Sequence, residues 1–134
     1  MNRYLAACGV ALAIGAGGCS EPPAAPTSLI LSAQLTNAGS TDRAILVQIV
    51  GADTSAHIDT LLAPTGSSYR LFTQRLSNTQ WRAIVTGNLS DGAMLRLTVP
   101  GRSRKGAYTA AILDVADASF AALAPGSRAV TIAP

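Results

Sequence analysis

Short runs of alternating apolar and polar residues fill the chain from residue 28 to residue 134, and they constrain its fold more than any other feature. In a β-strand every second side chain points to the same face, so a period of two in hydrophobicity indicates a strand with one buried face. Residues 28–36, SLILSAQLT, place three leucines and Ala33 on one face and then end at the turn-forming sequence NAGS.

Eight such runs are expected to be strands. They cover residues 28–36, 44–50, 57–63, 69–76, 81–89, 93–99, 107–115 and 128–132. Glycine or proline follows several of them directly, and no sustained helical period occurs between them. Residues 116–126 are expected to form one helical turn or a crossover. The pattern predicts an all-β fold, an antiparallel β-sandwich, with an up-and-down barrel as the alternative.

The sequence TGNLSDG before LRLTVP resembles the strand-turn-strand punctuation of immunoglobulin-like and cohesin-like sandwich domains. Asp91-Gly92 stands between two alternating runs and predicts a β-hairpin, because both residues tolerate positive φ. The run after this turn is expected to alternate strictly. Its inward-facing residues are Leu95, Leu97 and Val99, and its outward-facing residues are Met94, Arg96 and Thr98.

The composition indicates one folded domain. Hydrophobic residues make up 49% of the 134 residues and charged residues only 13%, a balance that disordered chains lack. Ten Lys and Arg against seven Asp and Glu give a net charge of +3, and Arg3 is expected to be lost with a leader. So small an excess of positive charge does not predict a nucleic-acid partner.

The first nineteen residues have the anatomy of a bacterial export signal. Arg3 gives the first three residues a positive charge, and residues 4–16 then form an uncharged, mostly apolar run. A helix that spans a bilayer needs about 20 apolar residues, so this shorter run predicts a cleaved leader. The sequence AGGC that ends at Cys19 resembles the lipobox of bacterial lipoproteins, although Ala16 stands where that family usually has leucine.

This resemblance implies a signal peptide over residues 1–18 and a lipidated Cys19 as the first residue of the mature protein. Acyl chains such as palmitate, at about 0.8 kcal/mol per buried CH₂, would anchor the chain durably in a membrane. Residues 19–27 then form the lipidated cysteine and a proline-rich tether, followed by the sandwich domain over residues 28–134.

The implied location is the bacterial cell envelope. In enteric bacteria an aspartate directly after the lipidated cysteine resembles an inner-membrane retention signal, and this chain has Ser20 at that position. The absence of this aspartate favours the outer membrane, with the domain facing the periplasm or the exterior. An ordinary signal peptide without lipid is one alternative. A retained N-terminal helix with two free cysteines is the other.

No metal, cofactor or catalytic site is expected in the domain. Both cysteines, Cys8 and Cys19, precede it, so they supply it with neither a disulfide nor a metal ligand. His57 is the only histidine, and no nucleophile, base and orienting group occur in a recognisable arrangement. A small hydrolase that uses scattered aspartates is kept as an alternative, and it predicts an acidic cleft with raised carboxyl pKa values.

Four residues are candidates for contact with a ligand or partner. Arg102, Arg104 and Lys105 form a dense basic cluster between two expected strands, where they could meet anionic lipid or an acidic partner. Trp81 begins its strand and is the candidate for an exposed platform that binds a glycan or a protein. The expected function is a non-catalytic, lipid-anchored binding or structural module, acting alone or as a subunit of a larger envelope assembly.

Overall fold

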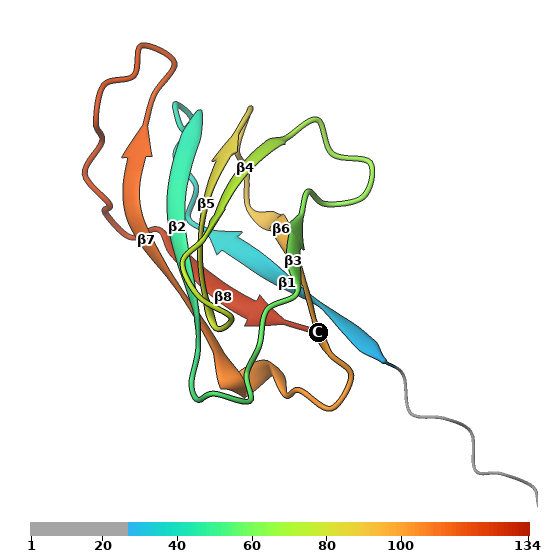
Figure 1. The fold of residues 1–134 in the computed structure, drawn as a ribbon. Helices are drawn as coiled ribbons and strands as arrows, with labels where there is room; N and C mark the ends of the chain where they lie inside the picture. Colours follow the sequence, from blue (N-terminus) through green and yellow to red (C-terminus); the bar gives the residue numbers. More distant parts are fainter. Residues whose placement is uncertain (1–26) are drawn as a thin grey trace, which may run out of the picture.

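The computed structural model describes residues 27–134, so the expected leader, Cys19 and the tether up to residue 26 lie outside the described residues. The described chain contains eight strands and one short 3-10 helix (Figure 1). The elements are β1 (Ser28–Thr36), β2 (Ala44–Gly51), β3 (Thr60–Leu62), β4 (Arg70–Arg75), β5 (Gln80–Thr86), β6 (Gly92–Pro100), η1 (Lys105–Ala107), β7 (Tyr108–Ala116) and β8 (Ala129–Ala133). Within residues 27–134 no helix is long and apolar enough to cross a bilayer.

The strands form two antiparallel four-stranded sheets, ordered β3-β6-β1-β8 and β4-β5-β2-β7. The sheets face each other, and their edge strands β7 and β8 contact each other (Figure 1). Each of the eight predicted runs overlaps one of these strands. The prediction of an all-β antiparallel sandwich is confirmed.

Most connections in the described chain pass from one sheet to the other. Of the described strands, only β4 and β5 are both consecutive and paired, whereas β5 and β6 lie in different sheets. The hairpin predicted at Asp91-Gly92 is therefore wrong. Leu89 of this connection is buried in the core, and the Asp91 carboxylate accepts a hydrogen bond from the Ala38 backbone N–H at 2.7 Å. These contacts direct the chain across the sandwich instead of back along the same sheet.

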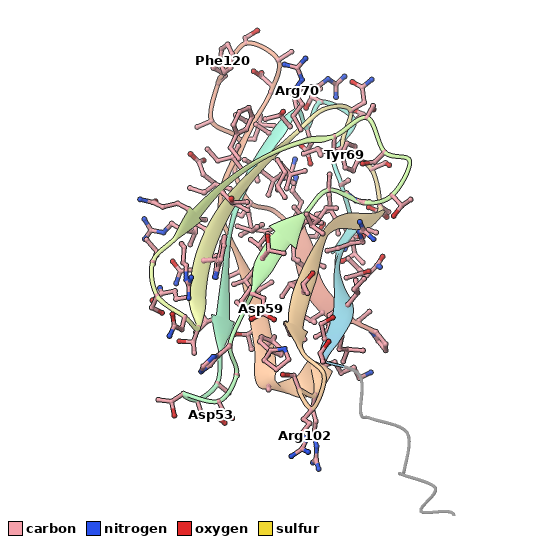
Figure 2. The ribbon with its side chains drawn as sticks, turned by 45° about the vertical axis from the view of Figure 1, so that its right-hand side comes forward. Asp53, Asp59, Tyr69, Arg70, Arg102 and Phe120 are labelled. Carbon is pink, nitrogen blue, oxygen red and sulfur yellow. The ribbon has the colours of Figure 1, made fainter. Side chains whose placement is uncertain are left out.

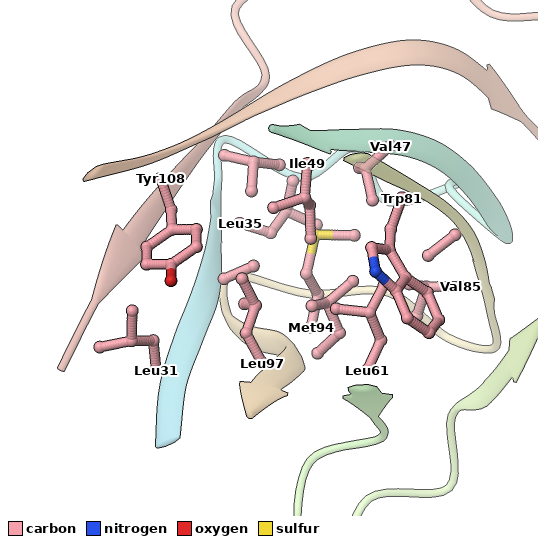
Figure 3. Packing of buried hydrophobic residues seen from close by; sticks show 14 of the residues in the cluster. Leu31, Leu35, Val47, Ile49, Leu61, Trp81, Val85, Met94, Leu97 and Tyr108 are labelled. Atoms are coloured by element: carbon pink, nitrogen blue, oxygen red, sulfur yellow. The ribbon is translucent and has the colours of Figure 1, made fainter. Parts of the chain in front are cut away.

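The core lies between the sheets and is built from the side chains that the alternation places inward (Figure 3). Burial alternates residue by residue along β2 and β5 and along most of β1. The buried hydrophobic residues of these strands are Leu31, Ala33, Leu35, Ile45, Val47, Ile49, Trp81, Ala83 and Val85. Removal of this apolar surface from water is the main favourable contribution to folding.

Met94 is a correction to the predicted alternation of β6. The side chain was expected to face outward, yet it is fully buried, as is that of Leu95 (Figure 3). Ala33 pairs with Leu95 and Gln34 pairs with Ala93, so Met94 is an extra residue without a partner on β1. Such a β-bulge lets two consecutive residues occupy the same face. The sequence pattern alone does not reveal where a bulge falls.

The predicted strand at residues 57–63 is reduced to the three residues of β3. Side chains take the backbone carbonyls that a longer strand would use, because the Tyr108 hydroxyl donates to the His57 carbonyl and the Trp81 indole to the Ile58 carbonyl. The Ile58 N–H donates to Asn78 O at 2.8 Å, beside one sheet, and the Asp59 N–H to Thr98 O at 2.8 Å, in the other. The segment therefore crosses between the sheets before it pairs.

Residues 116–126 contain no helical turn, so that alternative is wrong and the crossover is correct. Ala116 forms an isolated bridge with Ala122, and the Asp117 carboxylate accepts hydrogen bonds from the backbone N–H groups of Ser119 and Ala121 at 2.8 and 3.0 Å. An aspartate that bonds its own following backbone favours a turn over a helix.

A buried ion pair that the sequence analysis missed closes the structure at the C-terminal crossover. The Asp42 side chain is fully buried, and its Oδ2 and Oδ1 accept hydrogen bonds from Arg128 Nε at 2.6 Å and Nη2 at 2.7 Å. Arg128 Nη1 also donates to the carbonyls of Ala124 and Pro125. The pair ties the turn after β1 to the segment that leads into β8.

Candidate functional site

The outer face of the β4-β5-β2-β7 sheet carries an apolar row that crosses the strands. Phe72 of β4 pairs with Ile84 of β5, which pairs with Leu46 of β2. A register shift beside Leu46 places Leu113 at a bulge in β7, next to Asp114. Phe72 is 58% exposed, Ile84 40% and Leu113 45%. We call Leu46, Phe72, Ile84 and Leu113 the apolar row, and such a group of adjacent exposed apolar side chains indicates an interaction surface.

An arginine stands on each side of the apolar row. Arg70 is exposed two residues before Phe72 on β4. Arg82 lies two residues before Ile84 on β5, and its Nε donates a hydrogen bond to Gln48 Oε1 at 3.2 Å. Three residues of the row, Leu46, Phe72 and Ile84, line a shallow hollow of about 310 Å³ together with Arg82. The surface therefore combines an apolar centre with cationic borders.

The outer face of the other sheet is more mixed. Ile30 of β1 is 49% exposed, but its neighbours across the strands are Thr98 and Thr60. Leu62 of β3 is 41% exposed and pairs with Arg96. Polar residues thus separate the exposed apolar side chains on this face, which makes it a useful internal comparison.

The exposed platform predicted at Trp81 is wrong. The side chain is only 9% exposed and lies between the sheets (Figure 3). Its Nε1 donates a hydrogen bond to the Ile58 carbonyl at 3.2 Å, and the Arg75 guanidinium lies 5.9 Å from the ring centroid. An indole whose N–H is satisfied inside the protein stabilises the core and offers no stacking face to a glycan. The exposed phenylalanine rings belong to Phe72 and to Phe120, the latter 91% exposed.

The three predicted basic residues are exposed on the connection between β6 and β7, whose Arg102 is labelled in Figure 2. Backbone hydrogen bonds fix this connection, because the Ser103 N–H donates to Pro100 O at 2.8 Å and the Ala107 N–H to Arg104 O at 2.9 Å. Lys105 lies in η1, inside the turn that the second of these bonds closes. The structure thus brings Arg102, Arg104 and Lys105 together on one connection at one end of the sandwich.

Tyr108 supports the basic connection from the core side. Its hydroxyl donates to the His57 carbonyl at 2.7 Å and hydrogen-bonds to the Ser103 hydroxyl at 3.0 Å. Burial of the ring raises the pKa of Tyr108, so the phenol keeps its proton at neutral pH. The sequence analysis assigned no role to this hydroxyl, which a buried tyrosine normally satisfies with a nearby acceptor.

A hollow of about 300 Å³ lies beside the basic connection. Arg102, Ser103 and Arg104 line it on one side, and Asp53 and Ser55 line it on the other. The Asp53 carboxylate accepts hydrogen bonds from the Ser55 hydroxyl and backbone N–H, which lower the pKa of this carboxyl. Asp53 is therefore ionised at neutral pH and offsets part of the local positive charge.

Hydrogen bonds to neighbouring residues explain the lowered pKa values of two aspartates, Asp42 and Asp53. The Arg128 guanidinium holds the pKa of Asp42 below its usual range, and hydrogen bonds from Ser55 lower that of Asp53. The hydrolase alternative predicts raised pKa values at such carboxyls, so it gains no support from them. In residues 27–134 no group of three or more His, Cys, Asp or Glu residues is placed to hold a metal.

The apolar row was missed by sequence analysis, although part of its signal was present. Phe72 and Ile84 occupy outward positions in their alternating strands, where a polar residue is the usual choice. Their adjacency depends on the order and register of the strands, which a single sequence does not display.

No protein-family model matches this chain, and no curated protein matches it. The fold is similar to the crystal structure of the sixth cohesin from scaffoldin B of Acetivibrio cellulolyticus, determined in complex with a mutant Cel5 dockerin. The TM-score is 0.51 and the sequence identity 10%, over 72% of this chain and 80% of that chain. At this identity the similarity concerns the fold, and it agrees with the cohesin-like punctuation of the sequence.

Proposed function

We propose that this chain is a lipid-anchored protein of the bacterial cell envelope whose sandwich domain binds a protein partner through the apolar row. The observation that carries the binding proposal is the contiguous exposure of Phe72, Ile84 and Leu113 on one sheet face. A monomeric surface rarely exposes neighbouring large apolar side chains, because their burial by a partner is favourable. The similarity of the fold to a cohesin supports the proposal, since the structure of that cohesin was determined in complex with a protein, a dockerin.

The chemistry of the surface defines the partner. Neighbouring strands lie about 4.8 Å apart, so a row across four strands is about 14 Å long. The partner is an amphipathic segment with an apolar stripe of this length and with Asp or Glu at its borders. These carboxylates would meet Arg70 and Arg82, which are on opposite sides of the apolar row.

Paired variants on the two sheet faces test this assignment. Ile84→Asp places a carboxylate in the apolar row, whereas Ile30→Asp makes the same change on the other sheet, at a residue of similar exposure. The partner is recovered by crosslinking in membranes, purified and titrated calorimetrically against each variant. A buried interface anchor is worth 2 kcal/mol or more, so Ile84→Asp is expected to weaken binding at least 30-fold and Ile30→Asp less than threefold.

Charge reversal tests the borders of the row. Arg70→Glu together with Arg82→Glu is expected to weaken the same partner, and a partner whose border carboxylates are changed to lysine is expected to restore the affinity. A bound segment that carries basic borders, or equal losses from Ile84→Asp and Ile30→Asp, would contradict the proposed binding face.

The anchor is tested separately at Cys19. The mature protein is expected to begin at Cys19 with a mass increased by acyl chains, and Cys19→Ser is expected to release the domain from membranes. Cys8→Ser is the matched control, because residue 8 lies within the expected leader, and it is expected to leave membrane attachment unchanged. A mature chain that begins at Met1, or an unmodified Cys19 sulfur, would refute the lipid anchor.

A further inference from the structure

The basic connection lies at the end of the sandwich where the chain enters the domain. The Gly101 N–H donates a hydrogen bond to the Thr27 carbonyl at 3.3 Å, and Ser28 pairs with Pro100 at the end of β6. The first described residue is thus in contact with the start of the basic connection. Figure 2 shows Arg102 at this end and Arg70 at the opposite end of the molecule.

The three cations are available to a ligand. Arg102, Arg104 and Lys105 are exposed, and the ion pair found among residues 27–134 joins two other residues, Asp42 and Arg128. The Tyr108 and backbone hydrogen bonds described above hold the connection in one conformation, so little ordering is needed on binding. Asp53 and Asp59, the two carboxylates that act on Tyr108 electrostatically, contribute opposing charge at this end and leave a local excess of one positive charge.

The expected tether restricts how far this end can move from a membrane. Residues 20–27 are eight residues, and at about 3.3–3.6 Å per residue they reach at most about 29 Å. The nine residues of β6 are themselves about 31 Å long. A chain anchored at Cys19 therefore keeps the basic connection at high effective concentration near the lipid surface, where a weak attraction suffices to orient the domain.

We infer that Arg102, Arg104 and Lys105 bind the anionic phospholipid headgroups of the membrane that holds the anchor. This inference rests on the proposed lipid anchor for its biological setting but not for its test. Contact at this end orients the sandwich with Arg70 and Phe120 at the far end from the membrane (Figure 2). The apolar row crosses the outer face of the β4-β5-β2-β7 sheet, so this orientation leaves it free. Each basic residue near an anionic surface contributes about a fivefold gain in partitioning.

Vesicle binding by the domain without an anchor tests the inference. Residues 27–134 contain all eight strands and the whole core cluster, so this fragment is a folded unit. Its partition coefficient is measured by co-sedimentation with phosphatidylglycerol vesicles and with phosphatidylcholine vesicles in 0.1 M salt. Partitioning onto phosphatidylglycerol alone is expected.

Two double variants remove the same charge from the basic connection and from the outer face of the β4-β5-β2-β7 sheet. Arg102→Ser with Arg104→Ser is expected to lower partitioning onto phosphatidylglycerol about 25-fold. Arg70→Ser with Arg82→Ser changes the net charge equally, and it is expected to stay within threefold of the unmodified domain, because these residues lie on the outer face of the β4-β5-β2-β7 sheet. Glycerol phosphate at the same ionic strength is expected to leave partitioning unchanged.

Three results would overturn the inference. These are equal binding to both lipids, equal losses from the two double variants, and displacement by glycerol phosphate, which would indicate a site for a soluble phosphate. None of them bears on the mass of the mature N-terminus, so failure here is distinguishable from failure of the lipid anchor.

Discussion

Replacement of Asp42 by alanine is expected to destabilise the domain by about 3 kcal/mol. The Asp42 side chain has no exposed surface and accepts three hydrogen bonds, two from Arg128 and one from the Gly39 backbone N–H at 2.8 Å. The alanine variant leaves the Arg128 cation and the Gly39 N–H without this partner inside the protein. Each unsatisfied buried group costs free energy that unfolding recovers.

The size of this effect follows from the remaining contacts of Arg128. Loss of one partner of a buried ion pair costs about 3–5 kcal/mol. Arg128 is 13% exposed and keeps hydrogen bonds to the carbonyls of Ala124 and Pro125, so the lower end of that range applies. Asp59 is exposed on the same domain, and Asp59→Ala is expected to change stability by less than about 0.5 kcal/mol.

Urea unfolding at pH 7, followed by the fluorescence of Trp81, measures these differences. Trp81 is the one tryptophan of the chain and lies in the core, so its emission reports loss of the sandwich. A loss below about 1 kcal/mol for Asp42→Ala, or equal losses for Asp42→Ala and Asp59→Ala, would refute the assignment of the ion pair as the tie between the β1 turn and β8.

Three further measurements follow from the same structure. Folding lowers the pKa of Asp42, so the contribution of this carboxylate to stability is complete above its unfolded pKa near 3.8 and is lost as the pH falls through its folded pKa. The difference in free energy of unfolding between the unmodified domain and Asp42→Ala should therefore shrink on acidification. A difference that grows as the pH falls would contradict this reasoning. Trp81→Phe leaves the Ile58 carbonyl without its indole donor and is expected to cost about 1–3 kcal/mol in urea unfolding, while an unchanged midpoint would show that this bond contributes nothing. A Cβ at Gly51 would lie 2.1 Å from the Ala56 carbonyl oxygen, so Gly51→Ala is expected to lower the free energy of unfolding in urea by about 2 kcal/mol. Gly106→Ala is the neutral control, because a Cβ at Gly106 would have no atom within 4 Å.

The sheet strands were predictable because local alternation and burial agree. Along β2 and β5 every second residue is buried, so the period of two in the sequence directly reports the core face. Trp81 belongs to this pattern, since it shares a buried face with Ala83 and Val85. The prediction of an exposed platform at Trp81 therefore contradicted the same alternation that predicted its strand.

The remaining features depend on contacts between distant residues. Met94 is buried because a bulge opposite β1 adds one residue, and β3 is short because Trp81 and Tyr108 occupy the carbonyls before it. The Asp42 and Arg128 side chains meet across 86 positions of sequence. The apolar row likewise forms only when four strands come into register. None of these pairings leaves a local pattern in the sequence.

Photo-crosslinking in living cells tests the proposed binding face most directly. A photoreactive amino acid is placed at Ile84, in the apolar row, and in a second strain at Ile30, on the other sheet. Crosslinks are expected from position 84, to a partner segment whose apolar stripe is bordered by Asp or Glu, and not from position 30. Crosslinks from position 30 with none from position 84, or a basic segment captured at position 84, would contradict the account.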